Sequence, residues 1–302
     1  YALNLELTDP GFDPTVLCEF RARLLAGHAE QLLLDALLQR CRERQLLKAR
    51  GRQRTDSTHV LGAIRALNRL ECIGETLRHA LNTLAVIAPE WLRGQSQPEW
   101  VERYGPRVAA ARLPASKAAQ ATYAHTMGQD GAAVLAALYA ADAPGWLREL
   151  PAVRTLQRVW VQQYYTTAEE LRWRTEADGI PPARVFLSSP YDEEAHLARK
   201  DTTQWVGYKV HLTESCDEEL PRLITHVETT TGPIADGAVT PVIHHALQEK
   251  GLLPDTHLVD TGYLDAELLV TSQRDYKVDL LGPTRSDNHW QARAGQGFAV
   301  HN

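Results

Sequence analysis

Two aspartates that are far apart in the sequence stand in settings that suit metal chemistry. Asp260 follows a short apolar run, residues 257–259, and Gly262 interrupts the strand pattern directly after it. A run this short, bounded by turn residues, predicts a buried strand, and α/β proteins place their chemistry at the ends of such strands. Asp56 lies among small and hydroxyl residues in the segment RTDST, residues 54–58. The simpler interpretation is that each aspartate only caps the helix that follows it.

Five segments, two of which include these aspartates, resemble the DDE transposases of bacterial insertion sequences. They are RTDSTHV (54–60), WVGYKVH (205–211), HVETT (226–230), VDTGY (259–263) and the dipeptide GP (282–283). The resemblance runs in order over nearly the whole chain. It implies an α/β protein with an RNase H-like mixed-sheet core, an N-terminal helical region and a long helical insertion.

In this family, acidic residues hold two divalent metal ions that cut and join DNA. The resemblance assigns the first two acids to Asp56 and Asp260, which would bind Mg²⁺, or Mn²⁺ in its place. Mg²⁺ prefers carboxylate oxygens, and a pair of ions activates the attacking oxygen and stabilises the leaving one. The third acid of the family is a glutamate well downstream. Glu267 is the only glutamate after Asp260 and comes too early, so we expect the third acid beyond Asn302 and no cleavage by this chain.

The charge distribution suggests where DNA would bind. A net charge of −6 argues against a uniformly basic nucleic-acid-binding protein, but a basic run stands directly before Asp56. We predict that it neutralises DNA phosphates, with a solvated helix face as the alternative. The run consists of Arg40, Arg42, Arg44, Lys48, Arg50, Arg52 and Arg54. Lys209 and Arg285 are further candidates for the DNA backbone, and His257 for positioning a phosphate or water near Asp260.

The periodicity separates helical from mixed segments. Helical spacing of apolar residues predicts two helices between Pro14 and about Gln53, joined near Gly27, and helices again over 61–175. Beyond residue 180, Asp236 and Gly237 predict a turn. The predicted strands there are 185–187, 205–213, 223–227, 257–260 and 278–281, and the predicted helices are 241–250 and 266–274. The predicted domains are an N-terminal helical region (1–53), a first core strand (54–60), a helical insertion (61–180) and the RNase H-like core (181–302).

Composition places the chain among ordinary globular proteins, with 44% hydrophobic and 23% charged residues. Its four cysteines form no CxxC pair, which indicates a reducing cytoplasm rather than a disulfide framework. No apolar run reaches the length of a membrane span. The chain begins at Tyr1 and its only methionine is Met127, so we expect a fragment of a longer protein.

The resemblance also implies partners and a location. These are double-stranded DNA at the element ends and the target, a homodimer or larger assembly, and the bacterial cytoplasm at the nucleoid. The leading alternative is a catalytically dead relic that only binds DNA or partner subunits; a glutamate-bearing helix after Asn302 would distinguish the two. A generic nuclease of the same fold is a further alternative. A zinc or iron hydrolase built on the histidines is another, but no HExxH motif is present.

Overall fold

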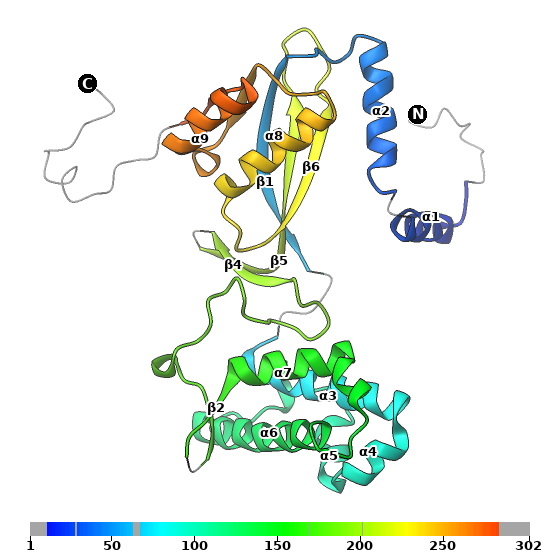
Figure 1. Cartoon of the computed structure of the whole chain (residues 1–302), viewed down its shortest axis with the longest axis vertical. Coiled ribbons are helices and arrows are strands. Elements are labelled where there is room, and N and C mark those ends of the chain that lie inside the picture. The colour runs from blue at the N-terminus through cyan, green and yellow to red at the C-terminus, as the bar shows by residue number, and fades with distance from the viewer. Residues whose placement is uncertain (1–10, 28, 63–66, 169, 201, 284–302) are drawn as a thin grey trace, which may run out of the picture. The chain divides into compact units, whose positions relative to one another are not determined.

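The computed structural model describes residues 11–27, 29–62, 67–168, 170–200 and 202–283, which form an α/β protein with a mixed six-stranded sheet (Figure 1). The chain divides into two compact units. The sheet unit comprises Tyr1–Asp56, Leu212–Val227 and Asp236–Asn302, and the helical unit comprises Ser57–His211 and Glu228–Ala235. Strands β1, β5 and β6 each contribute residues to both units.

The sheet combines parallel and antiparallel pairs. Its strand order is β4 (His196–Lys200), β5 (Thr203–Ser215), β1 (Arg52–Leu61), β7 (Thr256–Val259) and β8 (Asp279–Leu281), and β6 (Ile224–Thr231) also pairs with β5. The β1–β7 and β7–β8 pairs are parallel, and β4 runs antiparallel to β5. The Cys216 amide bonds to the Arg52 carbonyl and the Gly62 amide to the Val206 carbonyl, so β5 is antiparallel to β1. The predicted mixed sheet is confirmed, while its RNase H-like identity stays a prediction.

Two helices connect the parallel strands of the sheet unit. α8 (Thr240–Glu249) precedes β7 and lies across one face of the sheet (Figure 1), where Ile243 and Leu247 belong to one buried cluster with Val259 and Leu280. α9 (Ala266–Thr271) precedes β8 and continues into a π-helical turn, Ser272–Tyr276. The predicted order of helix, strand, helix and strand is therefore confirmed.

The N-terminal helices end earlier than predicted. α1 (Pro14–Ala26) begins at Asp13, whose carboxylate accepts from the Thr15 amide at 2.8 Å, and ends at Gly27. α2 (Leu32–Glu43) packs Leu38 and Cys41 into the same buried cluster of the sheet unit. The helical prediction to Gln53 is wrong at its end, because the chain leaves the helix at Arg44 and β1 begins at Arg52.

The helical unit is built mainly from helices that follow β1. They are α3 (Arg69–Ile87), α4 (Pro89–Gln95), α5 (Pro98–Tyr104), α6 (Lys117–Leu138) and α7 (Pro151–Gln163), followed by the hairpin of β2 (Tyr164–Thr166) and β3 (Leu171–Trp173). The short 3₁₀ turns of the described residues are Ala110–Arg112, Gly145–Glu149, Glu176–Asp178, Asp236–Val239 and Thr261–Tyr263. The predicted strand at 185–187 is wrong, because Val185 ends a turn and the next two residues join no strand pair. Strands β2, β3 and β4 were not predicted.

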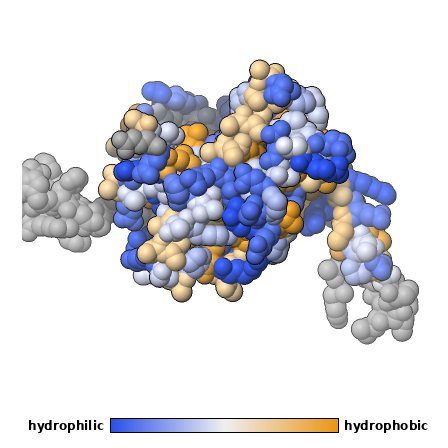
Figure 2. All heavy atoms as spheres, turned by 90° about the horizontal axis from the view of Figure 1, so that it is seen from below, coloured by the Kyte–Doolittle hydropathy of each residue, from blue (hydrophilic) through white to orange (hydrophobic). Residues whose placement is uncertain are grey.

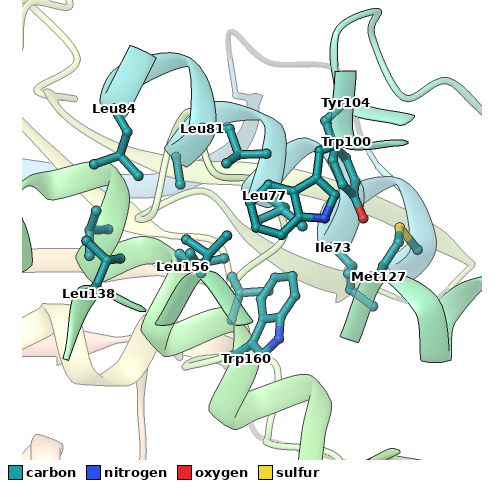
Figure 3. Close-up of a cluster of buried hydrophobic side chains, with 14 of the residues drawn as sticks. Ile73, Leu77, Leu81, Leu84, Trp100, Tyr104, Met127, Leu138, Leu156 and Trp160 are labelled. Carbon is teal, nitrogen blue, oxygen red and sulfur yellow. The ribbon is translucent and has the colours of Figure 1, made fainter. Parts of the chain in front are cut away.

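Aliphatic and aromatic side chains make the core of the helical unit (Figure 3). Ile73, Leu77 and Leu84 from α3 meet Leu156 and Trp160 from α7, all of them buried. Glycines let α6 and α7 approach closely. A Cβ added at Gly131 would stand 1.9 Å from Trp160 Cζ2, so only glycine fits there.

Among the described residues, no helix combines the length and apolar character needed to cross a membrane. Figure 2 shows hydrophilic and hydrophobic residues interspersed over the face seen there.

Candidate functional site: two acids on neighbouring strands

The parallel pairing of β1 with β7 brings the two predicted acids side by side. The last pair of the register joins Thr55 to Val259; Asp56 is the next residue of β1, and Asp260 directly follows β7. Neighbouring strands lie about 4.8 Å apart. The fold therefore places these aspartates at adjacent positions, although they are widely separated in the sequence.

The two aspartates also share one face of the sheet. Side chains alternate between the faces of a strand, and in β1 Gln53 and Thr55 are buried whereas Asp56 is exposed. In β7, Val259 is buried against α8 and Asp260 is half-buried. The carboxylates consequently lie on the face opposite the one that α8 covers.

The local structure of Asp260 explains its orientation. Its Oδ1 accepts a hydrogen bond of 2.8 Å from the Gly262 amide and caps the 3₁₀ turn Thr261–Tyr263. α9 is capped by Asp265 instead, whose Oδ1 accepts from the Leu268 amide at 2.8 Å. The capping interpretation is therefore partly right for Asp260, though for a different element. It is wrong for Asp56, which lies inside β1.

A third acid, Asp236, lies close to Asp260 and was not predicted as a site residue. A Cβ added at Gly262 would stand 3.1 Å from both Asp236 Oδ2 and Asp260 Oδ1, so the two carboxylates flank this glycine. Asp236 opens the 3₁₀ turn that leads into α8. The sequence indicated only a turn here, because nothing local shows that the residues after β6 return to the end of β7.

The two aspartates are the right type of ligand for a hard metal ion, but they are too few to complete its coordination. Carboxylate oxygens on neighbouring strands are the ligands that Mg²⁺ selects. Within the described ranges, however, no group of three histidine, cysteine, aspartate or glutamate side chains is arranged to hold a metal ion. Glu267 lies exposed in the first turn of α9. A complete metal centre would need a further ligand from outside the described residues.

Four members of the basic run already have partners within the sheet unit. Arg50 donates to Asp255 Oδ1 at 2.6 Å and to the carbonyls of Tyr276 and Lys277, so it ties the segment before β1 to the end of the π-helical turn. The other three pairs are Arg54 with Glu214, Lys48 with Asp217 at 3.7 Å, and Arg42 with the Lys250 carbonyl at 3.1 Å. These contacts supply a structural reason for much of the run.

The other three members of the run, Arg40, Arg44 and Arg52, are exposed like the first four, and contact with DNA phosphates stays a prediction for them. Lys209 is half-buried, and its ammonium donates to the Ile234 carbonyl. Arg285 falls outside the described residues.

His257 belongs to a buried polar network on the face opposite the acids. Its Nε2 lies 2.7 Å from Thr55 Oγ1, and its Nδ1 lies 2.9 Å from His244 Nε2 on α8. Thr55 Oγ1 in turn lies 2.7 Å from Thr213 Oγ1 on β5. Both histidines and Thr213 are fully buried. The expectation that His257 positions a phosphate near Asp260 is therefore wrong.

Burial keeps both histidines of this network neutral. Removal from water lowers the pKa of His244 to about 4. The same desolvation, with a contribution from His244, lowers the pKa of His257 to about 3. Neutral imidazoles suit a hydrogen-bonded network, because each ring can donate from one nitrogen and accept at the other.

Comparison of the chain with protein-family models, with curated proteins and with solved structures found no match.

Proposed function

We propose that the chain is part of a DDE-type transposase of a bacterial insertion sequence, in which Asp56 and Asp260 are the first two metal-binding acids. The observation that carries this proposal is their adjacency on one sheet face at the ends of the β1–β7 ladder. The strand order, with β1 between β5 and β7, suits the RNase H-like core that the sequence resemblance implies.

The chemistry would be metal-dependent cleavage and transfer of DNA strands. Asp56 and Asp260 would hold Mg²⁺, which when bound would supply activation of the attacking oxygen and stabilisation of the leaving oxygen. The hydrogen bond from the Gly262 amide holds the Asp260 carboxylate in a fixed orientation. Asp56 would face the same ions from β1.

The proposed partner is double-stranded DNA at the element ends and at the target, bound by a homodimer or larger assembly in the bacterial cytoplasm. Exposed Arg40, Arg44 and Arg52 precede or begin the acid-bearing strand. Cations at such positions attract the phosphates of a substrate that must reach Asp56, and their contribution weakens as salt rises.

Metal binding by the 302-residue chain tests the assignment. We expect Mn²⁺, followed by electron paramagnetic resonance, to bind the wild-type chain, and either Asp56→Asn or Asp260→Asn to weaken that binding strongly. Asp142→Asn, at an exposed aspartate of the helical unit, is the matched control. Equal Mn²⁺ binding by all four proteins would refute the assignment. In a protein that supplies a third acid, Asp260→Asn should also abolish metal-dependent strand cleavage.

A second candidate function is DNA binding without cleavage, because the described residues supply too few acids for a complete metal site. Three carboxylates arranged for a metal are not found among the described residues. Salt-sensitive DNA binding by this chain, without Mg²⁺-dependent nicking even when the full acid set is present, would select this function. Nicking that disappears in Asp260→Asn would select the transposase.

A further inference from the structure

A continuous series of buried side chains crosses from α8 to β5 beneath the acid-bearing strands. It runs from His244 to His257 on β7, to Thr55 on β1 and to Thr213 on β5, with separations of 2.9, 2.7 and 2.7 Å. All four residues are at most 3% exposed. In a dry interior each of these contacts must be satisfied, because an unpaired polar group there is costly.

The direction of donation follows from the one atom of the series that lacks a partner. Among the described residues, His244 Nδ1 is buried without a hydrogen-bond partner. If His244 Nε2–H donates to His257 Nδ1, then His244 Nδ1 carries no hydrogen and is only an acceptor without a donor. If His257 Nδ1–H donates instead, His244 Nδ1 must carry the hydrogen and becomes a buried N–H without an acceptor, which proteins avoid more strictly. His257 Nε2–H then donates to Thr55.

The contact between His257 and Thr55 joins the two strands diagonally. In the ladder, His257 stands opposite Gln53, and Thr55 stands opposite Val259. The hydrogen bond between the His257 and Thr55 side chains therefore connects positions that are offset by two residues along the strands. β7 is only four residues long and contributes few ladder bonds of its own. A slip of one residue would move its side chains to the other face, and it would carry Asp260 away from Asp56.

We propose that His257 is a positioning residue: through Thr55 it fixes the register of β7 on β1 and so keeps Asp260 beside Asp56. The link to metal binding rests on the proposed function, whereas the fixing of the register does not. His257 touches neither acid in this arrangement, because its side chain lies on the face that α8 covers.

Two substitutions at His257 separate its two hydrogen bonds. The amide of glutamine reaches about as far as imidazole Nε2, so His257→Gln keeps the bond to Thr55 and loses the bond to His244. The shorter amide of asparagine replaces Nδ1, so His257→Asn keeps the bond to His244 and loses the bond to Thr55. A purely structural role would make the two variants behave alike at equal stability.

The experiment measures amide hydrogen exchange and Mn²⁺ affinity in wild type, His257→Gln, His257→Asn and Asp260→Asn. We expect the amides of residues 53–55 and 257–259 to exchange faster in His257→Asn than in His257→Gln, at matched free energy of unfolding. We expect Mn²⁺ binding to weaken about tenfold in His257→Asn, at the lower end of outer-shell effects, and to be largely retained in His257→Gln. Equal exchange and equal affinity in the two variants would overturn the proposal.

The two claims fail separately. If Asp260→Asn leaves Mn²⁺ binding unchanged, the proposed metal site fails, and the exchange comparison alone decides whether His257 fixes the register. If His257→Asn does not fold, Thr55→Val removes the same bond. Thr225→Val is its matched control, because Thr225 is an equally buried threonine that bonds Gln53 at 2.8 Å. Faster exchange of residues 257–259 in Thr55→Val alone supports the proposal, and equal exchange in both contradicts it.

Discussion

The two units differ in the buried polar side chains that hold their elements together. In the helical unit two of the buried carboxylates, found beside neutral groups such as Gln163, each hold a loop or helix in place. Asp130 accepts from Trp100 Nε1 at 2.9 Å and from the Tyr104 hydroxyl at 2.6 Å. Glu75 accepts from the Val108 amide at 2.6 Å. In the sheet unit, the buried polar groups beneath the acids are neutral imidazoles, hydroxyls and an amide that connect neighbouring strands.

The difference reflects what each unit has to position. The helical unit packs a large apolar cluster (Figure 3), and its buried carboxylates Asp130 and Glu75 hold a neighbouring helix and loop. The sheet unit must hold short strands in one register, because its candidate site is made of residues from different strands. Directional hydrogen bonds specify register better than apolar contacts, which are not directional.

The largest effect is expected from breaking a buried charge in the helical unit. Asp130→Ala leaves Arg103, whose guanidinium lies 3.0 Å from the carboxylate, and Tyr104 without their partner. Loss of one member of a buried charged group costs about 3–5 kcal/mol. The free energy of unfolding in urea measures this cost, and Asp142→Ala, at an exposed site, should change it by less than about 0.5 kcal/mol. Similar values for both variants would contradict the comparison.

Adding a methyl group between α6 and α7 should cause the next largest loss of stability. Gly131→Ala forces a Cβ against the Trp160 ring, and overpacking of this kind costs about 1–3 kcal/mol. Gly94→Ala is the control, because it also lies in a helix but has open space around its added Cβ. We expect Gly94→Ala to be neutral or to stabilise by about 0.5–1 kcal/mol. Equal thermal unfolding of the two variants would show that the close helix contact is absent.

Acid should weaken the sheet unit through its neutral histidines. The folded pKa values, about 4 for His244 and about 3 for His257, lie below the unfolded value near 6.5. The unfolded chain therefore binds more protons, and stability that is present above pH 6.5 is lost as the pH falls toward the folded values. Each histidine contributes a slope of up to roughly 1.4 kcal/mol per pH unit.

Urea unfolding between pH 6.5 and 5 reads this slope directly. His257→Gln and His244→Gln should each flatten the dependence relative to wild type, because a titrating group has been removed. His125→Gln, in the helical unit and half-buried, is the control and should leave most of the slope. An unchanged slope in both network variants would show that these histidines are not buried in the neutral form.

The smallest effect is expected at the surface of the sheet unit. Arg50→Ala removes the contact to Asp255 and the bonds to two carbonyls at the π-helical turn. Because the Arg50 side chain is 38% exposed, solvent screening reduces the loss to about 1 kcal/mol. Arg40→Ala is the control and should leave stability unchanged. If Arg40→Ala instead weakens DNA binding while Arg50→Ala does not, Arg40 serves DNA binding and Arg50 serves stability.

Much of the fold was accessible from the sequence, and the missing parts have physical reasons. The period-two pattern at 205–213 and the capped helix at Pro14 were readable locally, and the structure confirms both. Strands β2, β3 and β4 escaped prediction because they span three to five residues and depend on their pairing partners.

The candidate site was predictable only in part. Asp56 and Asp260 were identified through their sequence setting, but their adjacency depends on the β1–β7 register, a contact between distant segments. Asp236 was missed for the same reason. The role of His257 was mistaken, because proximity to Asp260 in sequence does not reveal that alternate side chains of a strand face opposite sides.

Disulfide trapping tests the central claim that Asp56 and Asp260 stand at adjacent positions. Adjacent strands place their Cα atoms about 4.8 Å apart, within the range that a disulfide spans, whereas positions shifted by two residues lie too far apart. With Cys18→Ser and Cys216→Ser in every variant, mild oxidation of Asp56→Cys/Asp260→Cys should give the crosslinked peptide by mass spectrometry. Asp56→Cys/Leu258→Cys should not. Crosslinking of the second pair alone, or of neither pair, would contradict the register and with it the proposed metal site.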